Sequence, residues 1–171
     1  MKINTKSTLT AAMLTALAVS LSTFAIPIGA SKCFPIQHLC NVIAGVFLGL
    51  GYGVAMAFCT SLIRNLIGTG SPLAFPGSMV GAFLCGFLYQ HTGKLAAAYF
   101  GEVFGTGIIG GLLCYPVATL LMGQEAALFA YVIPFLISTA GGTVMAMILV
   151  GALYQSGAMS YLKGVLGGTA R

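Results

Sequence analysis

The chain has 171 residues, of which 58% are hydrophobic and only 5% are charged. A soluble domain carries roughly a quarter charged residues, so this composition excludes a soluble globular fold and indicates that lipid surrounds most of the chain. The net charge of +5 comes from scattered single basic residues, which argues against a nucleic-acid-binding surface.

A membrane-spanning helix needs about 20 mainly apolar residues to cross the hydrocarbon layer. The first apolar run, residues 8–28, follows Lys2 and Lys6. A signal peptide begins in the same way, but this run is long for a signal peptide, and we predict that it is retained as the first span. A loop over residues 31–37 is expected to follow.

Five further spans are predicted, in chain order, at about residues 38–50, 52–67, 77–90, 95–121 and 128–154. The chain is therefore expected to be a single all-α integral membrane domain over residues 1–171, built as a bundle of six transmembrane helices. The second and fourth spans are short, and we expect them to be tilted, broken or partly immersed. A short tail should follow the sixth span.

The basic residues predict the orientation of these spans. With the N-terminus in the cytoplasm, most of them fall on the cytoplasmic side, whereas Lys32 and Glu125 fall outside. The cytoplasmic set is Lys2, Lys6, Lys94, Lys163 and Arg171. Both termini are therefore predicted to be cytoplasmic.

Small residues recur four positions apart along several predicted helices. Pairs such as Gly77 and Gly81 let two helix backbones approach closely in lipid, where no hydrophobic force drives helices together. We expect most of these pairs to pack inside the bundle. Ala12 and Ala16 differ, because the first helix can also face a partner.

Groups for catalysis are scarce. Glu102 and Glu125 are the chain's only carboxylate side chains, and no phosphate-binding loop, catalytic serine elbow or paired-histidine motif is present. We therefore expect no enzymatic activity, no metal site and no cofactor in this chain, so any ATP used in transport must be hydrolysed by other subunits. The five cysteines include no Cys-x-x-Cys pair and are expected to be small buried hydrophobes.

Polar side chains within the apolar segments form the candidate ligand site, because lipid penalises unpaired polar groups. Arg64 and Glu102 can reach the same depth, so they either form a structural ion pair or contact a ligand directly. His38 and Asn41 share one helix face, although His38 is alternatively a capping or interfacial residue. The candidate substrate-binding residues are Gln37, His38, Asn41, Arg64, Asn65, Ser78, Glu102, Thr106 and Tyr115.

Aromatic residues lie near the predicted outer ends of the helices, where each could anchor the interface or stack on a ligand. They are Phe34, Phe75, Tyr115 and Tyr131. Together with the polar set they suit a small, flat, mostly neutral molecule that enters from outside. An ion channel is disfavoured, because no ring of like charges lines a pore.

Four motifs in order along the chain are similar to those of one transporter family. They are PIQHLCN at 35–41, SLIRNLIGTG at 61–70, AFPGS at 74–78 and GEVFGTG at 101–107. On these motifs the chain resembles the substrate-binding S components of energy-coupling factor transporters, most closely the ThiW type. The resemblance covers nearly the whole chain.

The resemblance implies a six-helix bundle in a bacterial or archaeal cytoplasmic membrane that captures a vitamin precursor outside the cell. The ThiW type is associated with hydroxyethylthiazole, the thiazole moiety of thiamine. The implied partners are one transmembrane T subunit and two ATPase subunits, which hydrolyse ATP while the S component topples in the membrane. Ala12 and Ala16 match the Ala-x-x-x-Ala motif with which the family's first helix meets the T subunit.

Other functions stay open at this point. The same fold could bind hydroxymethylpyrimidine or thiamine, although cationic thiamine would favour an uncompensated Glu102. A small membrane enzyme could use His38 and Glu102 as acid and base, and would chemically change its ligand. A purely structural subunit would bind no ligand and would tolerate the loss of His38 or Asn41.

Overall fold

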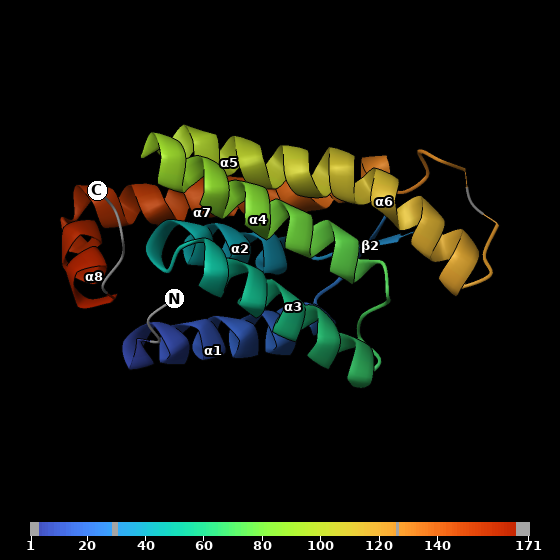
Figure 1. Cartoon of the computed structure of the whole chain (residues 1–171), viewed down its shortest axis with the longest axis horizontal. Helices are drawn as coiled ribbons and strands as arrows, with labels where there is room; N and C mark the ends of the chain where they lie inside the picture. The colour runs from blue at the N-terminus through green and yellow to red at the C-terminus, as the bar shows by residue number, and fades with distance from the viewer. Residues whose placement is uncertain (1–3, 29–30, 126, 167–171) are drawn as a thin grey trace.

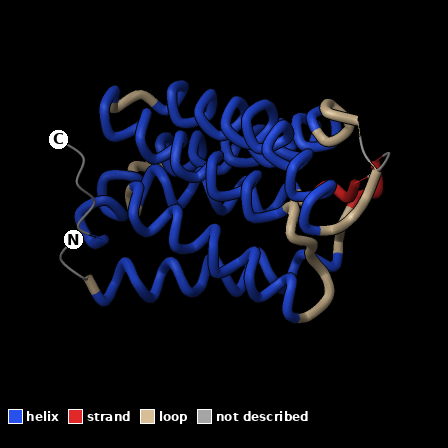
Figure 2. Tube along the Cα trace, turned by 45° about the vertical axis from the view of Figure 1, so that its right-hand side comes forward, coloured by secondary structure: helices blue, strands red, loops and turns tan. Residues whose placement is uncertain are grey.

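The computed structural model describes residues 4–28, 31–125 and 127–166 of the chain. Nearly all of these residues lie in helices that run side by side as an elongated bundle (Figure 1). A short β-hairpin lies at one end of the bundle, and the beginning of the first helix and the last helix lie at the other end (Figure 2).

The first helix, α1 (Thr5–Ser20), is shorter than the predicted span over residues 8–28. A single 3₁₀ turn, η1 (Leu21–Thr23), follows it. The chain then forms an antiparallel hairpin of β1 (Ile26–Ile28) and β2 (Ser31–Cys33). The helix ends earlier than predicted because strand pairing engages the backbone groups that a continued helix would need.

Three helices of increasing length come next: α2 (Pro35–Phe47), α3 (Leu50–Leu66) and α4 (Ala74–Thr92). Each begins two or three residues before the apolar segment predicted there. Gly49 joins α2 to α3 with a φ of 85°, a left-handed conformation that glycine adopts without steric cost. The tight connection places α2 beside α3.

The next helix is continuous from Leu95 to Leu121, but its winding changes along its length. The segments are α5 (Leu95–Glu102), the π-helical η2 (Val103–Gly110), α6 (Gly111–Pro116) and the π-helical η3 (Val117–Leu121). π-helical turns are often found at functional sites. Here the first change of winding follows Glu102 directly.

The chain ends with α7 (Val132–Gln155) and α8 (Ala158–Leu166). The α8 helix is an addition to the predicted fold, since the sequence indicates only a short tail there. Ser7 Oγ donates a hydrogen bond of 2.8 Å to the carbonyl oxygen of Leu166. This contact ties the beginning of α1 to the end of α8 at one end of the bundle (Figure 1).

Two of the described helices, Leu95–Leu121 and Val132–Gln155, are long and apolar enough to cross a membrane. Large apolar side chains also point outward, and Phe24, Leu66 and Leu120 are each more than 75% exposed. Such a surface suits contact with lipid. The structure is thus that of an all-α membrane protein, while the six spans and the cytoplasmic termini stay predictions.

Glycines bring α4 and the helix after it into backbone contact, as the four-residue spacing predicts. A Cβ atom at Gly105 would lie 2.9 Å from Gly81 Cα, and one at Gly110 would lie 2.6 Å from Gly77 Cα. No larger residue fits at these contacts. The close approach places Glu102 directly beside α4.

All five cysteines are free, and four are buried, as expected for small hydrophobes: Cys33, Cys40, Cys85 and Cys114. Cys59 is exposed on α3, so the expectation of burial is wrong for that residue. Within the described ranges no cluster of three or more histidine, cysteine or acidic residues could hold a metal ion.

Candidate functional site

Glu102 is completely buried and is held by three side chains. Its Oε1 accepts hydrogen bonds from His38 Nδ1 at 2.9 Å, Asn41 Nδ2 at 3.0 Å and Thr106 Oγ1 at 3.2 Å. An ionised carboxylate only accepts hydrogen bonds, so in the ionised state of Glu102 the proton of this contact lies on His38 Nδ1. Asn41 Nδ2 also donates to Ser78 Oγ at 3.1 Å, which joins α4 to the network. We call these five residues the Glu102 cluster.

Arg64, in the last turn of α3, is only 1% exposed. Its guanidinium lies 3.6 Å from the centre of the Phe34 ring, a cation–π contact. Arg64 Nη1 donates to Gln37 Oε1, and Nη2 lies 3.4 Å from the Thr69 carbonyl oxygen. Gln37 Nε2 donates in turn to Ser61 Oγ at 3.4 Å. We call these five residues the Arg64 cluster.

The expected ion pair between Arg64 and Glu102 does not form. Among the described residues the one salt bridge joins His38 and Glu102. The reason lies in α2, because successive residues of a helix point about 100° apart. His38 therefore turns toward Glu102, while its neighbour Gln37 turns toward Arg64, and the two clusters are separated.

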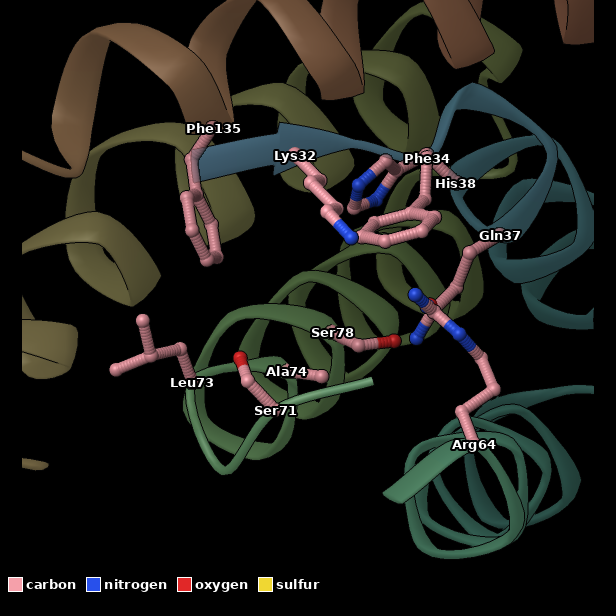
Figure 3. A pocket seen from close by; sticks show the side chains of 10 residues that line it. All are labelled: Lys32, Phe34, Gln37, His38, Arg64, Ser71, Leu73, Ala74, Ser78 and Phe135. Atoms are coloured by element: carbon pink, nitrogen blue, oxygen red, sulfur yellow. The ribbon is translucent and has the colours of Figure 1, made fainter. Parts of the chain in front are cut away.

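A small cavity lies between the clusters at the hairpin end of the bundle. Figure 3 shows the side chains around it, which come from β2, the junction after β2, α2, α3, α4, α7 and the loop before α4. They are Lys32, Phe34, Gln37, His38, Arg64, Ser71, Leu73, Ala74, Ser78 and Phe135. A second cavity, bounded by loop residues, adjoins it and shares Lys32, Phe34, Ser71 and Leu73.

The structure separates the nine predicted substrate-binding residues into three groups. Four line the cavity, namely Gln37, His38, Arg64 and Ser78. Three others, Asn41, Glu102 and Thr106, lie behind these in the Glu102 cluster. Asn65 and Tyr115 line neither cavity. Asn65 Nδ2 instead donates to the carbonyl oxygens of Ser61 at 2.8 Å and Ser71 at 3.0 Å, which fixes the loop after α3.

Six lining residues are absent from the nine predicted substrate-binding residues: Lys32, Phe34, Ser71, Leu73, Ala74 and Phe135. Of these, Phe34 is one of the aromatic residues predicted either to stack on a ligand or to anchor the interface. Lys32 reaches the cavity from β2, and Phe34 reaches it from the junction between β2 and α2 (Figure 3). A single basic residue between two apolar runs is the signal that could have identified Lys32. Leu73 and Phe135 carry no such signal, because apolar residues are common throughout the chain.

Ala12 and Ala16, predicted to meet a partner, are both exposed on α1. They line an apolar groove between α1 and α3, together with residues such as Met56 and Ile63. The small side chains leave the backbone of α1 open to close approach by another helix.

The model of one protein family, described as thiamine-precursor transporter protein (ThiW), matches residues 8–156. The matched range includes both clusters and all the cavity-lining residues. No curated protein and no solved structure matches the chain. The family consists of transporters rather than enzymes, in keeping with the scarcity of catalytic groups. The chain therefore belongs to the ThiW family of thiamine-precursor transporter proteins.

Proposed function

We propose that this chain is the substrate-capture subunit, or S component, of an energy-coupling factor transporter, and that it binds the thiazole moiety of thiamine, hydroxyethylthiazole. The observation that carries the proposal is the cavity between the two clusters, which combines polar side chains such as His38 and Ser78 with the rings of Phe34 and Phe135 (Figure 3). Small-molecule sites typically have apolar walls and a few placed polar groups.

His38 is the residue expected to bind the polar end of the ligand. Glu102 holds Nδ1 at 2.9 Å, which leaves Nε2 as the ring nitrogen available to the cavity. With Nδ1 engaged by Glu102, His38 presents Nε2 to the cavity, as a donor when the ring is protonated and as an acceptor when it is neutral. A hydroxyl such as that of a hydroxyethyl arm can pair with either form. Glu102 then acts as a positioning residue that fixes the tautomer and the direction of the ring.

The aromatic walls favour a single flat ring. Phe34 is fixed by Arg64, whose guanidinium lies 3.6 Å from the ring centre, and Phe135 faces the cavity from α7 (Figure 3). A heterocycle can stack on such rings. Thiamine, with two linked rings and a positive charge, suits the site less well, because none of the lining residues is acidic. Hydroxymethylpyrimidine, a single ring with a hydroxyl, is the second candidate.

The proposal includes a T subunit and two ATPase subunits as partners. The exposure of Ala12 and Ala16 supports a helix contact with the T subunit along α1. Lys6, Lys94 and Lys163 belong to the end of the bundle opposite the hairpin, which supports placing that end in the cytoplasm. The chain would then span a bacterial or archaeal cytoplasmic membrane several times, with the cavity facing outward.

Ligand-induced stabilisation of the purified chain in detergent tests the proposed substrate. The panel is hydroxyethylthiazole, hydroxymethylpyrimidine, thiamine and riboflavin. A ligand at 100 times its Kd stabilises the folded state by about 2.7 kcal/mol, so specific binding raises the unfolding temperature measurably. We expect a shift with hydroxyethylthiazole that His38→Ala abolishes. The matched control is His91→Ala, which removes an exposed histidine of α4.

A shift with the pyrimidine alone would overturn the proposed substrate, and no shift with any compound would overturn capture of these four molecules. The partner is tested separately by co-purification with a T subunit. The double substitution of Ala12 and Ala16 by leucine should abolish the complex while leaving ligand-induced stabilisation unchanged. Ala140→Leu, on an exposed position of α7, is the control. A complex that survives the double substitution contradicts this docking surface.

A further inference from the structure

Arg64 is a buried cation with neutral partners. Its guanidinium stays charged in proteins, and the side chain is 1% exposed. The partners described above are an amide oxygen, a carbonyl oxygen and an aromatic ring, from Gln37, Thr69 and Phe34. Arg64 Nε is buried and has no hydrogen-bond partner within the described part of the chain. A buried charge without a counter-charge is costly, and more so in a membrane protein.

The described residues do not supply an anion to balance it. Glu102 forms its salt bridge with His38, and Glu125 is exposed and forms no salt bridge with a described residue. Arg64 lies in the last turn of α3, where the helix dipole favours a cation. That dipole carries only a partial charge near the helix end, so it stabilises the guanidinium without neutralising it.

Lys32 brings a second positive charge to the same cavity. It stands on β2, and its side chain points in beside the ring of Phe34, on the side that faces Phe135 (Figure 3). Ten residues line this cavity, and none of them is acidic. The cavity therefore has two cations, one buried and one at its hairpin side, with the ring of Phe34 between them and Phe135 on the other side of Lys32 (Figure 3).

We infer that the ligand of this cavity carries an oxyanion, a phosphate ester or a carboxylate, bound between Arg64 and Lys32 while its ring lies against Phe34 and Phe135. The planar guanidinium suits the oxygens of such a group, and the ammonium adds a point charge. This inference rests on the proposed function, and it specifies the charge of the thiazole that the chain binds. Among thiazoles, the site selects one with an anionic arm over the neutral alcohol that the sequence alone favours.

Titration of the full chain in detergent with three thiazoles tests the inference. The probes are hydroxyethylthiazole, its phosphate ester, and the thiazole acetate that has a carboxylate in place of the alcohol carbon. Because charge-assisted hydrogen bonds are about twice as strong as neutral ones, we expect at least one anionic probe to bind roughly tenfold or more tightly than the alcohol. The two anionic probes distinguish a phosphate site from a carboxylate site.

Variants assign the effect to the two cations. Lys32 is exposed, so Lys32→Gln should fold normally and should weaken anion binding roughly tenfold, clearly more than it weakens alcohol binding. Arg64→Gln should weaken the binding of the anionic probes more strongly than Lys32→Gln does. The matched control, Lys94→Gln, removes an exposed lysine that does not line this cavity and should leave all three affinities unchanged.

Two outcomes separate this inference from the proposed function. A wild-type chain that binds the alcohol at least as tightly as both anionic probes overturns the inference and leaves thiazole capture intact. A chain that binds none of the three probes overturns both. If Arg64→Gln does not fold, Lys32→Gln decides alone, since equal loss of alcohol and anion binding in that variant would also contradict the inference.

Discussion

Two buried side chains at the site that can carry a charge, Glu102 and Arg64, differ in the partners that surround them. Glu102 is surrounded by donors from α2 and its own helix, and it has a charged or polarised partner in His38 at 2.9 Å. Arg64 is equally buried, and each side chain has one atom without a hydrogen-bond partner among the described residues, Arg64 Nε and Glu102 Oε2. The difference is that the partners of Arg64 are all neutral. One charge is balanced within the chain, and the other is not.

This difference indicates that Glu102 stabilises the structure and that Arg64 is available to a ligand. A charge that is balanced inside the protein can lock helices in place, as Glu102 at the end of α5 does through its bonds to α2 and to Thr106 of η2. A buried charge without a counter-ion in the protein can instead be neutralised by a ligand of opposite charge. The Glu102 cluster is therefore expected to govern stability, and the Arg64 cluster to govern affinity.

The largest effect is expected for Glu102→Ala. The substitution leaves His38 and Asn41 buried without their shared acceptor, and removing one partner from a buried ion pair typically destabilises a protein by about 3–5 kcal/mol. We expect a large drop in the thermal unfolding temperature in detergent. Glu102→Gln keeps the shape and one acceptor oxygen, so its loss should be clearly smaller. Equal losses in both variants would contradict the assignment of Glu102 to structure.

The next largest effect is expected for Gly81→Ala. An added Cβ would overlap Thr106 Oγ1 and lie 3.0 Å from Glu102 Oε2, so α4 must move away from the Glu102 cluster. Overpacking of this kind typically costs about 1–3 kcal/mol. Gly151→Ala is the control, because no atom lies within 4 Å of the Cβ position there. Unfolding measurements on both variants check the prediction, and an equal change in the two would contradict it.

Much of this packing follows from the sequence. Apolar runs predict where most helices lie, and glycines four apart predict that α4 contacts the next helix through Gly77 and Gly81. The hairpin could not be predicted, because two strands of three residues each leave no periodic pattern. The early end of α1 was missed for the same reason, since the apolar run continues through the first strand.

The sequence predicts which residues belong to the site better than it predicts which of them contact one another. A polar residue in an apolar segment stands out, which is how Gln37, His38 and Arg64 can be identified as candidates. The partner of Arg64 could not be derived, because the distance between two helices depends on how they pack. Lys32 is not among the predicted site residues, because its position depends on the hairpin. Phe34 is predicted only as a ring that either stacks on a ligand or anchors the interface.

Asn65→Ala should have a smaller effect, on the side of the Arg64 cluster. Asn65 ties the loop after α3 through hydrogen bonds to Ser61 and Ser71, and the loss of such bonds typically costs about 1 kcal/mol. Because Ser71 lines the cavity, we expect a modest loss of ligand affinity together with slightly lower stability. Gln90→Ala, at an exposed position of α4, is the control and should change neither.

The smallest effect on stability is expected for Arg64→Met, although Arg64 is as deeply buried as Glu102. Replacing a buried charge by an apolar side chain of similar length removes its desolvation cost together with its contacts, and such exchanges are often neutral or stabilising. We therefore expect the unfolding temperature without ligand to stay near that of the wild type or to rise, while stabilisation by an anionic thiazole is lost. A fall as large as that of Glu102→Ala would mean that Arg64 is balanced within the fold after all. The combination of kept stability and lost binding would instead identify Arg64 as a charge retained for the ligand.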